Sequence, residues 1–540
     1  MSAYLGLARA LETAASTRSK LAKIAALADA LRPLPENDLP AAARLLSGSP
    51  FAEWEQSVTS VGWATVARAA SAVTGWDLET IGASARAIGD LGEAIGLLLS
   101  RDSVPEPPLE ILEVDGRLRA LAGLRRAAEK QALIEDLLRR ATPVEARYLV
   151  KTLSGGLRVG ADLATVEEAI AAAFGAEREP VARAHRDSGD IGETAAAARD
   201  GRLEAIQFRL FHPIGFMLAS PIEDPREIEA ELSQDVIEDK FDGIRAHAHK
   251  SGSRVALFSR TLDDVTAQFP EIALALAVPP GEFLLDGEIV AWKDDRADSF
   301  FRLQRRLGRK APPAELLAEI PVAFVAYDCL AVGNTPLFEL PWRERRRELE
   351  RLAGSGAFRL STVHRAGNVA SLEELFRAAR ERGNEGLMLK REDSPYLAGK
   401  RGRAWRKWKK ALATLDVVVT AVEQGNGKRA GMLSDYTFAV RAGDSLVNIG
   451  KAYSGLTDEE IRRLGARFRK ITVARYGPVR AVAPEVVLEV AFDTIQKSSR
   501  HKSGFALRFP RIVRIREDKR PEEADTVERV EEIWRSIQGA

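Results

Sequence analysis

The hydrophobic and polar positions follow a helical pattern in the first part of the chain. Residues 1 to about 205 are rich in Ala, Leu, Glu and Arg and contain few strand-like runs, which predicts an all-helical region. In Thr142-Pro143-Val144-Glu145, a hydroxyl cap, a first-turn proline and a capping-box acid predict a helix that stops near Gly155-Gly156. Thr165-Val166-Glu167-Glu168 predicts the start of the next helix in the same way.

The pattern changes after about residue 205. Leu210-Phe211-His212-Pro213-Ile214-Gly215 contains proline and glycine and is typical of a linker. Short apolar runs and alternating positions then predict strands rather than helices. These strands are expected at residues 235–240, 255–258, 283–291, 322–328, 385–390 and 405–410.

A third pattern begins after about residue 412. Short strands are predicted at 415–422, 437–440 and 486–492, with a basic, glycine-rich turn at 425–431. Helices are expected near 456–470 and 521–538. A small barrel of the oligonucleotide-binding type fits this pattern. Because 540 residues are too many for one ordinary domain, we expect three, at 1–205, 206–412 and 413–540.

The stretch EDKFDGIRAHA contains the strongest candidate for chemistry. Alternation along 235–240 places Glu238 and Lys240 on the same strand face, and Asp242-Gly243 ends the strand in a turn, with Arg245 just beyond it. A lysine amine attacks phosphorus only when it is neutral, so such a lysine must sit where its pKa is lowered. The stretch is either a nucleotide-binding lysine motif or a hairpin whose charges are merely solvated.

Further motifs place polar residues within or beside the predicted strands. Ser259-Arg260-Thr261 puts an arginine at a strand end. Asp286 and Glu288 interrupt an apolar strand, and because buried acids need partners we expect them to face a site that holds cations. Tyr327 precedes the acid that closes the strand at 322–328, and Glu385 to Lys390 bracket another strand with an acid and a lysine.

Basic residues cluster locally although the overall charge is balanced. The chain has 79 basic and 78 acidic residues, a net charge of +1 and a pI near 7.8. The windows 399–410 and 497–520 are strongly basic, as expected of patches that neutralise backbone phosphates. Within Trp405-Arg406-Lys407-Trp408-Lys409-Lys410, alternation is expected to place Lys407 and Lys409 on one strand face and the two tryptophans on the other.

Two other basic segments have alternative interpretations. Arg302, Arg305, Arg306, Arg309 and Lys310 form either a third phosphate-binding cluster or the solvated face of a helix. The segment from Lys151 to Gly160 combines bases, a hydroxyl and exposed amides next to a helix start. It is suited either to phosphate contacts or to an ordinary helix–helix turn.

The ordered set EDKFDGIR, SRT, LLDGEIVA, VAFVAYD, EGLMLK and WRKWKK, followed by RFPRIVRIREDK, resembles the ATP-dependent DNA ligases of the covalent nucleotidyltransferase superfamily. The resemblance spans about 206 to 520. It implies a multidomain protein with an all-α DNA-binding domain, an α+β nucleotidyltransferase core of ATP-grasp-like adenylation type, and a β-barrel OB-fold domain. It also favours phosphate contacts at the 151–160 loop.

The resemblance implies roles for individual residues. Lys240 is expected to attack the α-phosphate of ATP and become adenylylated, with Glu238 reading the adenine amino group. The other implied contacts are Arg245 and Arg260 with the ribose and phosphates, Tyr327 with the purine face, Glu288 and Glu385 with Mg²⁺ or Mn²⁺, Arg401, Lys407 and Lys409 with the α-phosphate, and Arg516, Asp518 and Lys519 with the leaving pyrophosphate. Tyr327 and Thr261 stand where the family commonly has phenylalanine and asparagine.

The implied activity is the sealing of nicks in duplex DNA, through a lysyl-AMP intermediate and an adenylylated 5′-phosphate, in replication, repair or recombination. An RNA ligase or an mRNA guanylyltransferase shares the lysine chemistry, but neither is expected to carry the helical N-terminal domain. From a different class, a DNA-binding scaffold with a decayed core remains an alternative. Failure to form a covalent nucleotide adduct would support that scaffold.

Composition narrows the setting of the protein. A single cysteine, Cys329, excludes an intramolecular disulfide and a cysteine-rich zinc site, whereas NAD-dependent bacterial ligases usually carry a four-cysteine zinc module. The N-terminus shows neither a signal peptide nor a membrane span. We therefore expect a cytoplasmic, nucleoid-associated monomer with no membrane contact.

Overall fold

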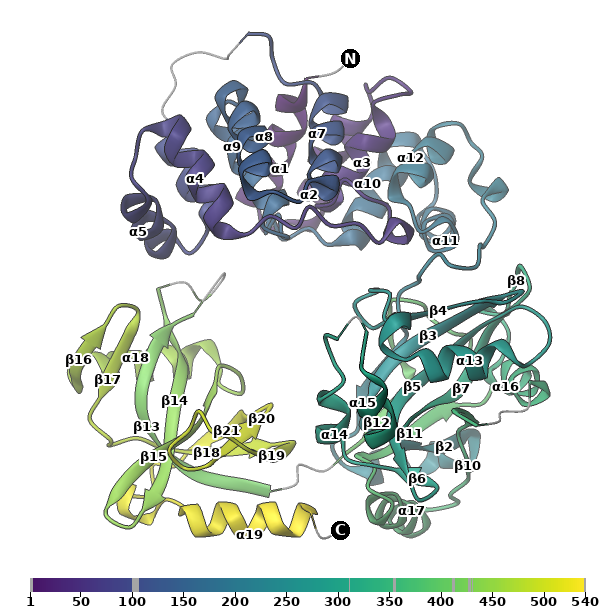
Figure 1. Ribbon diagram of the computed structural model, residues 1–540, viewed down its shortest axis with the longest axis vertical. Helices are drawn as coiled ribbons and strands as arrows, with labels where there is room; N and C mark the ends of the chain where they lie inside the picture. The colour runs from purple at the N-terminus through teal and green to yellow at the C-terminus, as the bar shows by residue number, and fades with distance from the viewer. Residues whose placement is uncertain are drawn as a thin grey trace. The chain divides into compact units, whose positions relative to one another are not determined.

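The computed structural model describes residues 3–99, 106–309, 311–352, 356–409, 413–425, 429 and 431–538. The chain divides into two compact units, one made of Met1–Phe376 with Leu387–Trp408 and the other of Arg377–Gly386 with Lys409–Ala540. The first unit holds a helical region and a two-sheet domain, and the second holds the strand-rich C-terminal region (Figure 1). The domain limits near 205 and 412 stay predictions.

The N-terminal region is helical, as its hydrophobic pattern predicts. One face of each helix packs into a shared core of leucine, alanine and other apolar side chains, among them Leu7, Leu27, Leu118 and Leu149. The helices are α1 (Tyr4–Ser16), α2 (Lys20–Leu31), α3 (Leu39–Ser47), α4 (Trp63–Thr74), α5 (Leu78–Ile88), α6 (Leu91–Leu98), α7 (Ile111–Gly123), α8 (Ala127–Arg140), α9 (Pro143–Leu153), α10 (Leu163–Phe174), α11 (Arg178–Ser188) and α12 (Ile191–Arg199).

The start of α9 confirms the capping-box prediction, whereas α10 begins earlier than predicted. The Thr142 hydroxyl accepts the Glu145 amide N–H at 3.4 Å, and the Glu145 carboxylate accepts the Thr142 amide N–H at 2.8 Å. At α10 the N-cap is Asp162, whose carboxylate accepts both the amide N–H and the hydroxyl of Thr165. Aspartate caps helices as well as threonine does, and the structure uses Asp162, three residues before Thr165.

The segment from Lys151 to Gly160 is more internal than its composition predicts. Lys151 belongs to α9, is buried, and places its Nζ 2.6 Å from a Glu93 carboxylate oxygen. Arg158 Nη1 lies 3.3 Å from the Asp90 carboxylate. These two contacts favour an ordinary helix–helix turn over a phosphate site for the basic side chains.

The middle of the chain folds into two sheets flanked by helices (Figure 1). The first sheet has the strand order β1-β12-β11-β2-β10, and the second follows β4-β3-β5-β7-β8, with β6 paired to β5 and β9 paired to β7. The first sheet comprises β1 (Leu218–Pro221), β2 (Asp235–Lys240), β10 (Val363–His364), β11 (Gly386–Arg391) and β12 (Arg401–Trp408). The second comprises β3 (Ile244–Ser251), β4 (Arg254–Ser259), β5 (Phe283–Lys293), β6 (Arg296–Ala297), β7 (Val322–Val332), β8 (Thr335–Pro336) and β9 (Phe358–Leu360). The helices are α13 (Pro270–Ala277), α14 (Phe300–Gln304), α15 (Ala314–Glu319), α16 (Trp342–Arg351) and α17 (Val369–Glu381).

Two glycines allow the close approach of strands in this domain. A Cβ on Gly243, in the turn between β2 and β3, would lie 2.3 Å from the Ile289 carbonyl oxygen. A Cβ on Gly287, within β5, would lie 2.5 Å from the Phe324 ring. Any larger residue would push these elements apart, so the Asp242-Gly243 turn holds the end of β2 against β5.

The arginines near residue 305 are paired within their own domain. Arg305 Nη1 lies 2.5 Å from a Glu319 oxygen, Arg302 pairs with Asp298, and the fully buried Arg306 pairs with Glu271. Neither alternative from the sequence describes them fully, because Arg306 is internal rather than solvated. Lys310 lies outside the described residues.

The C-terminal region is rich in strands. Strand β13 pairs with β14, β17 and β18, and β18 also pairs with β21. The strands are β13 (Ala413–Gln424), β14 (Leu433–Ala442), β15 (Ser445–Ala452), β16 (Thr472–Tyr476), β17 (Val479–Val482), β18 (Val487–Phe492), β19 (Thr494–Lys497), β20 (Phe505–Arg508) and β21 (Arg511–Ile515). Helices α18 (Asp458–Lys470) and α19 (Val527–Gln538) confirm the two helical predictions, while most of the predicted turn at 425–431 lies outside the described residues.

Across the part of the chain that the structure describes, no helix is both long and apolar enough to cross a membrane.

Candidate active site

A pocket opens between the two sheets of the middle domain. Residues of β1, β2, β11 and β12 form one wall, and residues of β3, β5 and β7 form the other. The space between the walls, including the open mouth, is about 790 Å³, which is enough for a nucleotide-sized ligand. The lining brings together these residues expected at the site from the sequence: Glu238, Lys240, Arg245, Arg260, Glu288, Tyr327, Arg401 and Lys407.

Glu238 is a buried carboxylate in the wall of this pocket. Its side chain is only 2% exposed. Lys390 Nζ lies 2.5 Å from Oε2, the Ser361 hydroxyl donates to Oε1 at 2.8 Å, and Arg346 Nη1 lies 3.5 Å from Oε1. These donors satisfy a charge that would otherwise be costly to bury, and they fix the carboxylate in place.

Lys390 is a site residue to which the sequence interpretation gave no role. It lies on β11, and its Nζ sits 4.3 Å from the centre of the Tyr327 ring and 4.4 Å from the centre of the Trp405 ring. Burial lowers the pKa of the Lys390 amine, although the Glu238 carboxylate acts in the opposite direction. The period-two alternation of strand residues could have indicated this role, because it places Met388 and Lys390 on the same strand face, and both line the pocket.

Arg245 reaches the pocket but is also part of a buried network. Its Nη2 and Nε lie 2.6 and 3.1 Å from the two oxygens of Asp286, and the Tyr396 hydroxyl donates to Asp286 at 2.8 Å. Burial alone would lower the pKa of Arg245, yet Asp286 holds it well above the usual value. Asp286 therefore does face a cation, and that cation is a protein side chain.

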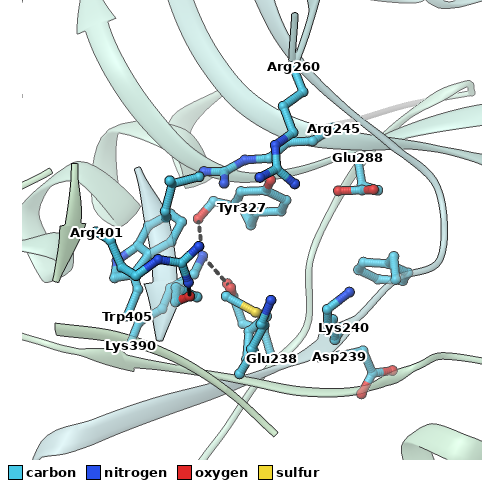
Figure 2. Close-up of a pocket in the computed structure, with 15 residues that line it drawn as sticks. Glu238, Asp239, Lys240, Arg245, Arg260, Glu288, Tyr327, Lys390, Arg401 and Trp405 are labelled. Carbon is cyan, nitrogen blue, oxygen red and sulfur yellow. Dashed lines mark hydrogen bonds and ion pairs between the residues drawn. The ribbon is translucent and has the colours of Figure 1, made fainter. Parts of the chain in front are cut away.

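Lys240 and Glu288 lie together on another part of the lining. Lys240 is the last residue of β2, and Glu288 lies on β5, against which the Asp242-Gly243 turn packs. Figure 2 shows both side chains on the side of the pocket away from Lys390 and Trp405. The pocket thus has a buried part around Glu238 and a second part with an amine and a carboxylate.

Three further residues predicted at the site line the same pocket. Arg260 follows β4 and approaches from the second sheet (Figure 2). Tyr327 packs edge-on to Trp405, with ring centres 6.2 Å apart, and burial raises the pKa of its hydroxyl well above the usual value. Arg401 donates to the Ala219 carbonyl on the neighbouring strand β1.

The predicted orientation of the side chains on β12 is wrong. Trp405 lines the pocket together with Lys407, whereas Trp408 packs against Phe376, with ring centres 4.5 Å apart. Residues 405 and 408 are three apart and cannot share a face in a strand of period two. Arg406, on the opposite face from Lys407, pairs with Asp235 and with Glu231.

Five residues with predicted roles at the site, Glu385, Lys409, Arg516, Asp518 and Lys519, are not among those that line the pocket. Glu385 and Lys409 flank β11 and β12, and Lys409 Nζ lies 3.8 Å from Glu385 and 2.8 Å from Asp493. In the C-terminal region, Arg516 and Lys519 both pair with Asp416, at 2.8 and 2.6 Å. Their roles in nucleotide binding stay predictions.

Glu288 is the predicted metal ligand that the pocket contains. Among the described residues there is no group of three or more His, Cys, Asp and Glu side chains placed to hold a metal ion. Mg²⁺ is commonly bound in proteins through one or two carboxylates together with water and substrate phosphates. Glu288 on the Lys240 side of the pocket is compatible with that mode of binding, in which water and phosphate oxygens supply the other ligands.

Known proteins resemble this chain over most of its length. Family models described as DNA ligase N terminus, ATP dependent DNA ligase domain and ATP dependent DNA ligase C terminal region match residues 3–171, 216–409 and 429–519. A probable DNA ligase from Koribacter versatilis is 46% identical over 556 residues, covering 98% of this chain and 96% of that protein. A DNA ligase from Methanopyrus kandleri is 36% identical and covers 99% of both.

A solved structure named Pmar-Lig_Pre has the same fold. Its TM-score is 0.63 at 16% identity, and the match covers 95% of this chain and 99% of that one. The matched models span the helical, two-sheet and strand-rich regions, and the sequence relatives extend over nearly the whole chain. The chain therefore belongs to the ATP-dependent DNA ligase family.

Proposed function

We propose that this chain, as an ATP-dependent DNA ligase, seals nicks in duplex DNA and carries AMP on Lys240 between the two halves of the reaction. One observation carries the residue assignment. Lys240 and Glu238, two residues apart on β2, line one pocket with the basic Arg401 and Lys407 of β12. The arrangement provides a nucleophile, an acceptor for a base and positive charge for phosphates around a single ligand.

The first step transfers AMP to the enzyme. The neutral Lys240 amine attacks the α-phosphorus of ATP, a P–N bond forms, the bond to the pyrophosphate oxygen breaks, and the amine loses a proton. Glu238 accepts from the adenine amino group, and Tyr327 covers the purine face. Arg260, Arg401 and Lys407 stabilise the charge that develops on the phosphates.

A divalent metal is assigned to the same step. Glu288 is the carboxylate in the pocket that would contact Mg²⁺ or Mn²⁺, and Glu385 is proposed as a second ligand. When bound, the ion supplies positive charge at the phosphate oxygens.

The remaining steps use the DNA nick. The AMP moves from Lys240 to a 5′-phosphate oxygen, which breaks the P–N bond and returns a proton to the amine. The adjacent 3′-hydroxyl then attacks the 5′-phosphorus and displaces AMP. Arg516, Lys519 and Lys409 are proposed to bind phosphates during the cycle, which requires Arg516 and Lys519 to exchange the Asp416 carboxylate for the ligand.

The proposed setting follows from the substrate. Nicks occur in chromosomal DNA, so we propose that the protein acts at the nucleoid. We also propose that it acts as a monomer, whose contacts with the duplex on both sides of the nick position the two DNA ends.

The test is a label chase with the full chain. The wild type and Lys240→Ala are incubated with magnesium and ATP labelled at the α-phosphate, and unlabelled nicked duplex is then added. We expect label on the wild type alone, followed by its loss from the protein as the nick is sealed. An unlabelled wild type would contradict the proposal and favour a DNA-binding scaffold.

A second part of the experiment distinguishes enzymes that act on different substrates. The same labelled protein is offered nicked duplex RNA, and the first step is repeated with GTP. Transfer to DNA with ATP is expected. Transfer to RNA alone would indicate an RNA ligase, and labelling with GTP in place of ATP would indicate a guanylyltransferase.

A further inference from the structure

Two residues behind the pocket wall hold Glu238 without being part of the pocket lining. Ser361 follows β9 and is 3% exposed, and Arg346 lies on α16 and is 8% exposed. Arg346 Nη1 lies 2.9 Å from the Ser361 hydroxyl oxygen, and that hydroxyl donates to Glu238 Oε1 at 2.8 Å. The three side chains therefore form a chain of hydrogen bonds that ends on the pocket carboxylate.

The direction of these hydrogen bonds follows from the donors available. A guanidinium can only donate, so the Ser361 oxygen accepts from Arg346 and its single proton is left for Glu238. A second guanidinium nitrogen, Nη2, donates to the Ser361 carbonyl at 2.8 Å, and Nε donates to Glu350 at 2.8 Å. Arg346 thus donates hydrogen bonds to both the side chain and the backbone of Ser361.

Ser361 also lies where the chain passes from one sheet to the other. The strand before it, β9, pairs with β7 of the second sheet, and the strand after it, β10, pairs with β2 of the first. Val363 of β10 is the register partner of Glu238 itself. The position of the Ser361 hydroxyl is therefore set from both walls of the pocket.

The contacts leave Glu238 suited to one kind of ligand group. An ionised carboxylate has about four acceptor positions and no donor. Ser361 and Arg346 contact Oε1, and Lys390 contacts Oε2. These three donors fix the orientation of the carboxylate, so that its remaining acceptor positions are presented to a ligand. Adenine presents an amino donor at the position where guanine presents a carbonyl acceptor.

We propose that Ser361 and Arg346 are positioning residues that hold Glu238 as a fixed acceptor and thereby set the preference for adenine over guanine nucleotides. The inference rests on the proposed function, in which Glu238 reads the base. It extends the nucleotide site by two residues that do not line it, and it assigns them to base selection rather than to the transfer of the nucleotidyl group.

The test measures the initial rate of enzyme–nucleotide adduct formation against ATP and GTP concentration for the full chain. For Ser361→Ala we expect the half-saturating ATP concentration to rise about tenfold, because a displaced acceptor weakens binding, with the maximal rate changed less than about twofold. The ratio of ATP to GTP efficiency should fall by a similar factor. Arg346→Met should change both quantities in the same direction.

Matched variants separate positioning from stability. Ser361→Thr retains the hydroxyl and should restore the ATP preference, and Arg347→Ala, an exposed arginine on the same helix, should match the wild type. If Ser361→Ala lowers the melting temperature but keeps the ATP half-saturation and the ATP:GTP ratio, the pair is only structural and the inference is wrong. Should Arg346→Met fail to fold, Ser361→Ala decides alone. A wild type that forms no adduct would refute the proposed function instead.

Discussion

Two clusters in the two-sheet domain, one around Asp286 and one around Glu238, hold a buried carboxylate in different ways. Asp286 is fully buried and does not line the pocket, and Arg245 and Tyr396 satisfy its carboxylate. Glu238 is nearly as buried, but it lines the pocket. The same pairing of acid and cation thus stabilises the fold in one cluster and presents an acceptor in the other. The role of each carboxylate therefore depends on the surface that it faces and not on its residue type.

The pKa values reflect this difference. Burial alone would raise the pKa of Asp286, but Arg245 and then His247 lower it below its usual range. In the Glu238 cluster burial lowers the pKa of the Lys390 amine, while the Glu238 carboxylate acts in the opposite direction. The Asp286 cluster is therefore a closed ion pair, while the Glu238 cluster includes an amine whose charge is less firmly held.

The largest expected effect is the loss of the Asp286 carboxylate. Asp286→Ala leaves Arg245 buried without its partner, which should lower the free energy of unfolding by about 3–5 kcal/mol. Denaturant unfolding measures this loss, with Glu315→Ala, an exposed acid on α15, as a control expected within about 0.5 kcal/mol of the wild type. A loss under about 1 kcal/mol for Asp286→Ala would mean that the pair contributes little to the fold.

Acid should destabilise the Asp286 cluster through His247. This ring is buried, stacks on Phe216 with ring centres 3.7 Å apart, and faces Asp286, Arg245 and Tyr396. Burial lowers the pKa of His247 to about 4, from about 6.5 in an unfolded chain. As the pH falls, His247 is protonated in the unfolded chain before it is protonated in the folded protein. Its contribution to the free energy of unfolding is therefore complete above pH 6.5 and is lost as the pH falls to about 4. The loss amounts to about 3 kcal/mol.

Unfolding of the wild type and His247→Gln between pH 7 and pH 4 measures this contribution. The variant should show a shallower loss, although not a flat one, because burial also lowers the pKa of His249. Equal pH slopes for the two proteins would show that His247 is not the group that titrates.

In the Glu238 cluster the expected effect falls on nucleotide binding. Glu238→Gln removes the charge and turns one acceptor into a donor, so the half-saturating ATP concentration for adduct formation should rise about tenfold, equivalent to about 1.4 kcal/mol. The matched comparison is Asp286→Asn, the same chemical change in the other cluster. If both variants weaken ATP binding equally, the two clusters do not differ as described.

The smallest expected effect is that of one hydroxyl group. Tyr396→Phe removes the donor to Asp286 at 2.8 Å and the acceptor of the Met217 amide N–H at 3.1 Å. We expect a loss of about 1 kcal/mol in the free energy of unfolding. No change on denaturant unfolding would show that water or Arg245 replaces the hydroxyl.

The sequence predicted the elements of the fold and most of the pocket. The strand ending in Lys240, the helix after Thr142 and the strand-rich C-terminal region follow from local patterns, because caps and period-two alternation are local signals. Motif order then placed Glu238, Arg260 and Tyr327 at one site, and the structure brings them together.

The sequence could not show partners that are distant along the chain. Ser361 reaches Glu238 from the crossover between the sheets and Arg346 reaches it from α16, and no local pattern marks either contact. The sequence does not indicate the role of Lys390 because its charge partner is 152 positions away, nor the burial of Arg306 because its acid, Glu271, lies on α13. Trp405 and Trp408 were placed on one face although strand periodicity already separates them.

The most direct test of the account is to locate the nucleotide on the protein. Two lysines of the pocket, Lys240 and Lys390, come from different strands and fall in different proteolytic peptides. After reaction of the full chain with ATP and magnesium, mass spectrometry of these peptides should find AMP on Lys240. AMP on Lys390, whose pKa burial lowers, would contradict the assignment of the nucleophile and of the clusters around it.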